Sequence, residues 1–163
     1  MEPWDVETLR RLKTAELLAV SRAILAELKA RGVIRSGNAP AGDYAELLVR
    51  QATGGELAAN SQKSWDLLAP DGERLQVKAR IVTNPENRGE RQLSVFRSWD
   101  FDAAVIVLFD GAFGIWRASH IPADVVESHA RVTPYVGGWR VTATNALLDC
   151  GEDWTERLRL AIA

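Results

Sequence analysis

Apolar and polar residues alternate most clearly between residues 64 and 81, where the pattern predicts a β-hairpin. The first strand carries Trp65-Asp66-Leu67, and Pro70-Asp71-Gly72 supplies the turn. The second strand then alternates two sets of side chains, apolar Leu75, Val77, Ala79 and Ile81 with polar Gln76, Lys78 and Arg80. Because successive side chains of a strand point to opposite faces, we expect the hairpin to bring Asp66, Gln76 and Lys78 to one place.

The remaining periodicities predict an α/β fold, with a mixed central β-sheet flanked by helices and an added long N-terminal helix. Helices are expected over 5–31, over 43–53, from Pro122 to His129 and from Asp153 onward; strands are expected over 101–109, 112–118 and 136–144. The whole chain, residues 1–163, is expected to be a single domain, with an N-terminal helix in 1–35, a core in 40–150 and a C-terminal helix in 151–163.

Composition fits an ordinary globular protein. The 163 residues are 47% apolar and 26% charged, and no apolar run approaches the length of a membrane span. The single cysteine, Cys150, cannot form an internal disulfide, and no signal peptide is visible at the start. We therefore expect a cytoplasmic protein that makes no contact with a membrane.

Charge is distributed unevenly along the chain. The net charge is -2, which argues against a protein that coats nucleic acid. Residues 60–99 carry a net charge of +2, whereas residues 100–163 carry -4. The positive part contains the predicted hairpin, which is consistent with a surface that faces phosphate groups, although ordinary scatter of surface charge explains it equally well.

Asp66 is the residue hardest to explain structurally, because strands are depleted in aspartate and a buried acid requires a partner or a metal. A carboxylate, an amide oxygen and an ammonium group suit a hard cation such as Mg²⁺ or Mn²⁺ and a water that attacks a phosphodiester. Glu46 lies on the preceding predicted helix. It is either a further acid of this site or half of a capping box that begins at Asp43.

The order of these residues resembles the PD-(D/E)XK nuclease superfamily, the restriction-endonuclease-like fold. Asp66 matches the acid of its first strand, Gln76-Val77-Lys78 matches its second motif, and Glu46 matches its helix acid. Glutamine at the second position is similar to the Mrr-type restriction enzymes and to some Holliday-junction resolvases. The resemblance covers roughly residues 40 to 110, within a nuclease-like core of 40–150.

The resemblance implies a metal-dependent endonuclease that hydrolyses DNA. Asp66, Gln76 and Glu46 would hold Mg²⁺ or Mn²⁺, and Lys78 would position or activate the water. Five residues are candidates for contacting DNA: Arg80, Lys63, Ser64, Arg88 and Arg91. A homodimer is implied because cutting two strands needs two sites.

The residues leave other readings open. Gln76 and Lys78 also fit the solvated face of a half-buried strand, and Gln76 removes one negative ligand relative to the family pattern. The alternative is a non-catalytic domain of this fold that binds DNA, or a protein partner in a defence or repair system. A purely structural α/β domain is the third reading, and RNA is an alternative to DNA.

Overall fold

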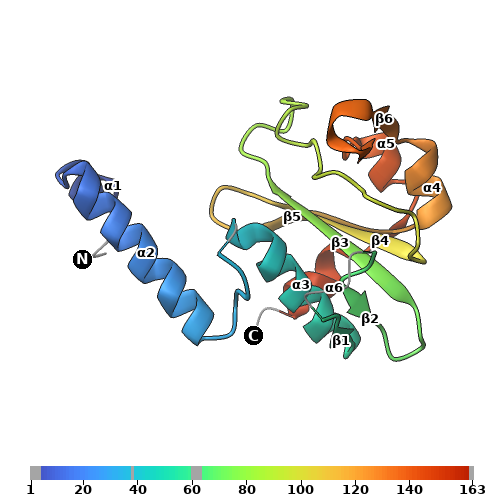
Figure 1. The fold of residues 1–163 in the computed structure, drawn as a ribbon, viewed down its shortest axis with the longest axis horizontal. Coiled ribbons are helices and arrows are strands. Elements are labelled where there is room, and N and C mark those ends of the chain that lie inside the picture. The colour runs from blue at the N-terminus through green and yellow to red at the C-terminus, as the bar shows by residue number, and fades with distance from the viewer. Residues whose placement is uncertain (1–4, 38, 60–63, 162–163) are drawn as a thin grey trace. The chain divides into compact units, whose positions relative to one another are not determined.

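A computed structural model describes residues 5–37, 39–59 and 64–161 (Figure 1). The chain divides into two compact units, Met1–Pro40 and Ala41–Ala163. The helices are α1 (Val6–Arg10), α2 (Thr14–Ala30), α3 (Pro40–Thr53), α4 (Ala123–Ser128), α5 (Asn145–Leu148) and α6 (Thr155–Leu160), with a 3₁₀ turn at Pro134–Val136. Within the part described, no helix is long and apolar enough to cross a membrane.

The first unit corrects the prediction of one helix over 5–31, because the chain forms two. The Asp5 carboxylate caps α1 by accepting from the Thr8 amide at 2.6 Å. A new start follows at Lys13, whose amide donates to the Glu16 carboxylate at 2.7 Å. These two caps divide the segment into separate helices, although its leucine periodicity is continuous. Among the described residues, neither α1 nor α2 contains a buried side chain.

The second unit is built on a mixed six-stranded sheet in the order β1-β2-β3-β4-β5-β8. Its strands are β1 (Glu56–Leu57), β2 (Leu67–Leu68), β3 (Arg74–Ile81), β4 (Ala103–Phe109), β5 (Ile115–Pro122) and β8 (Glu152–Asp153). Only β3 and β4 pair in parallel; the other neighbours are antiparallel. The coarse fold prediction, an α/β protein with a mixed sheet and flanking helices, is therefore confirmed.

Both faces of this sheet are covered, which explains why every residue of β4 is buried. Val105 and Val107 face a core formed with α3 and α6, whereas Ile106 and Leu108 face a second core formed with α4 and α5. Figure 1 shows α3 and α6 on one side of the sheet and α4 and α5 on the other. The register pairs Gln76 with Ala104 and Lys78 with Ile106, so the polar side chains of β3 share the face of the second core.

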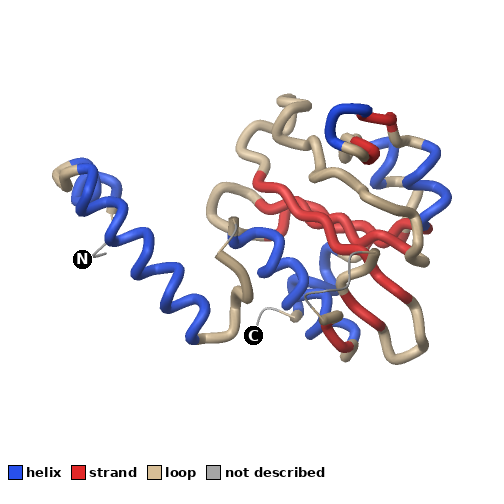
Figure 2. Tube along the Cα trace, in the orientation of Figure 1, coloured by secondary structure: helices blue, strands red, loops and turns tan. Residues whose placement is uncertain are grey.

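The connection from β3 to β4 contains no helix anywhere in residues 82–102, all of which the structure describes (Figure 2). The resemblance to the nuclease superfamily implies a core of one helix, three strands, a second helix and a fourth strand. The structure differs from that core here, because the second helix is absent from this connection. The Glu90 carboxylate closes the connection by accepting from the amides of Thr83 at 2.5 Å and Asn84 at 2.9 Å. The segment 92–96 then packs along the chain near Val141 and Trp139, through main-chain bonds at Leu93 and Phe96.

The strand predicted over 136–144 is shorter than expected and belongs to another sheet. Its ordered part, β7 (Gly138–Arg140), pairs with β6 (Arg131–Thr133) in a separate two-stranded hairpin. Two main-chain contacts, Phe96 with Trp139 and Gln92 with Thr142, extend this hairpin onto the loop between β3 and β4. The hairpin therefore anchors that loop over the polar face of β3.

One polar cluster fixes where β3 begins. Asp102 accepts from the Arg74 amide at 2.7 Å and from its guanidinium at 3.1 and 3.2 Å, and Asp100 accepts from the same guanidinium at 2.7 Å. The side-chain bonds from Arg74, followed by the bond from its amide, hold the pKa of Asp102 below its ordinary value. Asp100 and Asp102 thus have a structural role, holding Arg74 at the start of β3.

Replacing Asp102 with asparagine is expected to lower stability in a pH-dependent way. A carboxyl group whose pKa is depressed by folding stabilises the protein above its unfolded pKa, and this contribution is lost as the pH falls through the folded value. Urea unfolding midpoints of the two proteins should therefore differ most above about pH 4 and converge at lower pH. Asp124→Asn, at another exposed aspartate, is the control; an equal loss there would contradict the assignment.

Candidate functional site

Among the residues that the structure describes, the hairpin of β2 and β3 leaves most of one edge of β3 without a neighbouring strand. β2 pairs with β3 only at Leu75 and Arg74. Asp66, immediately before β2, takes over at the next positions: its amide donates to the Leu75 carbonyl at 2.8 Å, and its carboxylate accepts from the Val77 amide at 2.7 Å. An acidic side chain thus occupies the place where a strand would continue.

Asp66 and Gln76 meet as the sequence pattern predicted. The Gln76 side-chain amide donates to Oδ2 of Asp66 at 2.5 Å, the same oxygen that accepts from Val77. Because an ionised carboxylate can only accept, Gln76 presents its nitrogen to Asp66. Its amide oxygen is directed elsewhere, so the two groups do not offer adjacent oxygens as a simple reading of the motif suggests.

Lys78 extends from the same face of β3 and is held by the loop between β3 and β4. Its Nζ donates to the Ser94 hydroxyl and to the Val95 carbonyl, both at 3.1 Å, and lies 4.7 Å from the centre of the Phe96 ring. These three loop residues were not predicted, because nothing in the sequence indicates that the segment folds back onto β3. They fix the position of the ammonium group.

Burial dominates the ionisation of Lys78 and lowers the pKa of its amine below the ordinary value. The charges of Asp66 and Glu46 act in the opposite direction, and Arg97 adds to the lowering. Lys78 is therefore within electrostatic reach of both predicted acids. Glu46 projects from α3, half-buried, next to Ala45 of the first core.

The donor set suits a hard cation in its chemistry. Mg²⁺ and Mn²⁺ prefer oxygen ligands, and the Asp66 and Glu46 carboxylates and the Gln76 amide oxygen are of that type. One Asp66 oxygen already accepts two N–H groups. No group of three His, Cys, Asp or Glu side chains able to hold a metal occurs in residues 5–37, 39–59 and 64–161. A cation here would rely on two carboxylates, with Gln76 in place of a third.

The predicted DNA contacts lie in different settings. Arg80 is exposed and donates to the Glu90 carbonyl at 3.2 Å, Ser64 is half-buried, and Arg88 lines a pocket described below. Lys63 lies outside the residues that the structure describes. These placements leave Arg80 and Arg88 accessible to a ligand.

Arg91 requires a correction. It is only 8% exposed, and its guanidinium donates to the carbonyls of Ala143 and Pro85 and to the Asn145 side chain while lying over Trp116. Burial and three acceptors give it a structural role, joining the loop to the segment before α5. Its side chain is almost closed to solvent, so it is not exposed for a ligand to contact.

Comparison with known proteins adds no relative: neither a protein-family model nor a curated protein matches the chain. The resemblance to the nuclease superfamily therefore depends on the residues and geometry described above.

Proposed function

We propose that this chain is a metal-dependent nuclease that hydrolyses DNA phosphodiester bonds. The supporting observation is the bond between Asp66 and Gln76 at one edge of β3, with the half-buried Lys78 on the same face of that strand and within reach of the Asp66 charge. A half-buried lysine near carboxylates, with a lowered pKa, is typical of a functional site.

Each residue of the proposed site would have a separate role. The carboxylates of Asp66 and Glu46 would hold Mg²⁺ or Mn²⁺, and the Gln76 amide oxygen would join them once the Gln76 nitrogen no longer donates to Asp66. A bound ion would supply Lewis-acid stabilisation of the charge that develops on the phosphate. Lys78 places a positive or proton-accepting group beside the attacking water. Specificity for sequence or structure comes from the loops, from a second copy that cuts the other strand, or from a protein partner in a defence or repair system.

The contacts of Lys78 fit it for accepting a proton. A neutral amine has two N–H groups and one lone pair, and the two loop acceptors, Ser94 and Val95, engage the two hydrogens. The lone pair of Nζ then points away from the loop and can take a proton from water. A charged Lys78 would instead stabilise the transition state electrostatically.

A second candidate, a non-catalytic nuclease-fold domain that binds DNA or a protein partner, is favoured by one specific observation. Asp66 already accepts two N–H groups through one oxygen, and Gln76 turns its nitrogen toward it. This closed arrangement stabilises the hairpin without a cation. In that case Asp66 and Gln76 would only hold the hairpin together.

Cleavage assays separate the two candidates. Supercoiled, linear and branched DNA, and an RNA strand, are incubated with the purified protein in Mg²⁺, in Mn²⁺ and in EDTA. Asp66→Asn is the matched variant, because asparagine can still accept from Val77 but carries no charge. If the protein is a nuclease, we expect metal-dependent cleavage by wild type and none by Asp66→Asn. Circular dichroism should show that the variant keeps the same fold.

Two outcomes count against the nuclease. Equal cleavage by both proteins would mean that the activity does not come from this site. Cleavage by neither favours the binding domain, for which Asp66→Asn should leave DNA affinity unchanged or raise it, since it removes a negative charge.

A further inference from the structure

Three arginines without acidic partners gather beside the small hairpin of β6 and β7. Arg131 of β6 lies directly opposite Arg140 of β7 in the register, an arrangement of like charges that destabilises a sheet. Arg88 joins them from the loop between β3 and β4. Within residues 5–37, 39–59 and 64–161, none of the three guanidinium groups forms an ion pair or a hydrogen bond.

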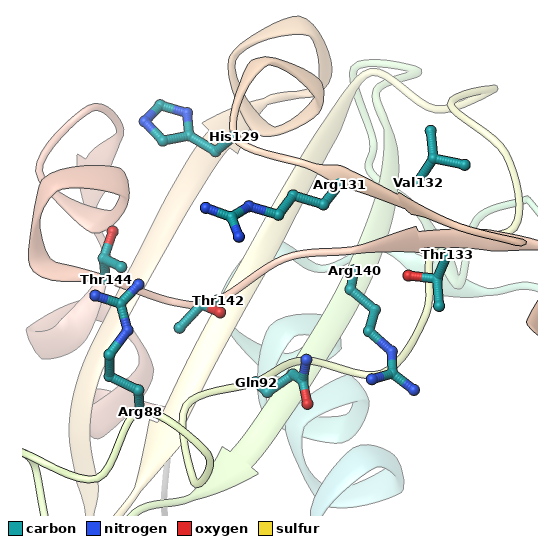
Figure 3. A pocket seen from close by; sticks show the side chains of 9 residues that line it. All are labelled: Arg88, Gln92, His129, Arg131, Val132, Thr133, Arg140, Thr142 and Thr144. Atoms are coloured by element: carbon teal, nitrogen blue, oxygen red, sulfur yellow. The ribbon is translucent and has the colours of Figure 1, made fainter.

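These arginines line one pocket of about 540 Å³. Thr133, Thr142 and Thr144 add hydroxyl groups, and within the described part of the chain no acidic residue and no Phe, Tyr or Trp ring lines it. In Figure 3 the Arg88 and Arg131 guanidinium groups lie on the side of Thr142 and Thr144, and Arg140 extends toward Gln92. The lining is therefore almost entirely a set of hydrogen-bond donors with excess positive charge.

The floor of the pocket is held in place by the core beneath it. Gln92 pairs with Thr142 through the main chain, and the Leu93 amide donates to the Val141 carbonyl at 2.9 Å. The buried Arg91 fixes the same segment by donating to the Ala143 carbonyl at 2.8 Å. The donors of the pocket are thus carried on a packed scaffold, which reduces the entropy lost on binding.

We propose that this pocket binds phosphate groups of a nucleic-acid strand. Guanidinium groups bind phosphate oxygens in a bidentate manner, and threonine hydroxyls donate to the same oxygens. Among the described residues, the lining holds no carboxylate, which disfavours a cation, and no Phe, Tyr or Trp ring on which bases usually stack. Its one imidazole, that of His129, has its Nδ1 3.0 Å from the Val125 carbonyl. The pocket would therefore hold the backbone without reading the bases.

The pocket and the candidate site share one short segment. Gln92 lines the pocket, and Ser94, two residues further on, contacts the Lys78 amine. Two residues span at most about 7 Å, roughly two nucleotide rises along a strand. A strand with phosphates in the pocket would therefore lie close to Lys78. The choice of a nucleic acid as the ligand rests on the proposed function. The preference of the pocket for phosphate rests only on its lining residues.

The experiment measures binding without cleavage, in EDTA, using fluorescently labelled single-stranded and double-stranded DNA. The test variant is Arg131→Gln with Arg140→Gln. The control is Arg10→Gln with Arg11→Gln, which removes the same charge from exposed arginines of the first unit. We expect the test variant to raise the dissociation constant at least about tenfold and to reduce the salt slope by about 1.4 to 1.8, as for two lost phosphate contacts.

Further readouts keep the inference falsifiable. Because Arg131 and Arg140 repel each other, the test variant should unfold at the same or higher urea concentration than wild type; a loss of stability would indicate a structural role instead. Unchanged DNA affinity in the test variant would overturn the inference. Binding of tripolyphosphate that depends on these arginines, without DNA binding, would assign the pocket to a free phosphate compound and overturn the nucleic-acid ligand.

The two proposals fail in distinguishable ways. If the protein cuts no DNA in Mg²⁺ or Mn²⁺ but loses affinity with the Arg131 and Arg140 substitutions, the pocket stands and the nuclease does not. If Asp66→Asn abolishes cleavage and the arginine substitutions change neither affinity nor salt slope, the nuclease stands and the pocket does not.

Discussion

Lys78→Met is expected to reduce DNA cleavage by at least about 10²-fold, the scale of a lost general base or charge stabiliser. Methionine keeps an unbranched side chain but removes the amine that lies over the Phe96 ring. Removing a half-buried amine offsets the loss of its two hydrogen bonds to Ser94 and Val95, so we expect stability to change by no more than about 1 kcal/mol. Single-turnover cleavage and urea unfolding measure the two effects.

Arg80→Met is the matched control, because Arg80 lies on the same face of the same strand but is exposed. It should weaken binding at most modestly and leave the cleavage rate of bound DNA unchanged. A Lys78→Met protein that folds and cuts like wild type would remove Lys78 from the mechanism. Equal losses in both variants would indicate a general effect of positive charge.

The lowered pKa of Lys78 also predicts how the rate and the stability depend on pH. If the neutral amine accepts the proton, the rate rises with pH through the folded pKa and levels off before the ordinary value of about 10.4. A lysine whose pKa is depressed by folding makes the protein more stable as the pH rises from its folded pKa to its unfolded pKa. Lys78→Met should abolish both dependences.

The sequence predicted best what local pattern determines. Alternation placed Asp66 against Gln76, and the continuous apolar run of 101–109 corresponds to β4, which is buried on both faces. The short helix after Pro122 was also predicted, since helix-start residues act over a few positions. These elements establish the mixed sheet and one edge of the candidate site.

Contacts between segments far apart in the chain could not be predicted from the sequence. The partners of Lys78 come from a loop, and no periodicity in the sequence indicates that this loop lies over β3. Arg91 has the sequence context of a surface residue, but in the fold it is buried and bonded to the Ala143 carbonyl. The donors of the phosphate pocket come from segments about 40 to 50 residues apart. A signal for them exists in the alternation of Arg140, Thr142 and Thr144, which puts three donors on one side of an extended segment.

Gly138→Ala is expected to destabilise the second unit by about 1–3 kcal/mol, the usual cost of an overpacked site. A Cβ atom at this position would lie 2.5 Å from the Phe96 carbonyl oxygen and would also overlap the Val95 side chain. The Phe96 carbonyl cannot move away freely, because it accepts from the Trp139 amide at 2.9 Å. The hairpin and the loop would have to separate.

That separation should reach the candidate site, because the Val95 carbonyl is one of the two acceptors of the Lys78 amine. We therefore expect Gly138→Ala to lower cleavage as well as stability, and to weaken DNA binding at the neighbouring pocket. Urea unfolding, single-turnover cleavage and DNA titration in EDTA measure the three effects on one protein.

Gly42→Ala is the control for this substitution. Gly42 lies in α3, and a Cβ atom added there would meet no atom within 4 Å. Alanine is the better helix former by up to about 1 kcal/mol, so this variant should be as stable as wild type or more so, with unchanged cleavage. If Gly138→Ala behaved like Gly42→Ala, the close packing of the loop on β7 would be wrong. The loop would then have no fixed place from which to hold Lys78, and the proposed geometry of the site would fail with it.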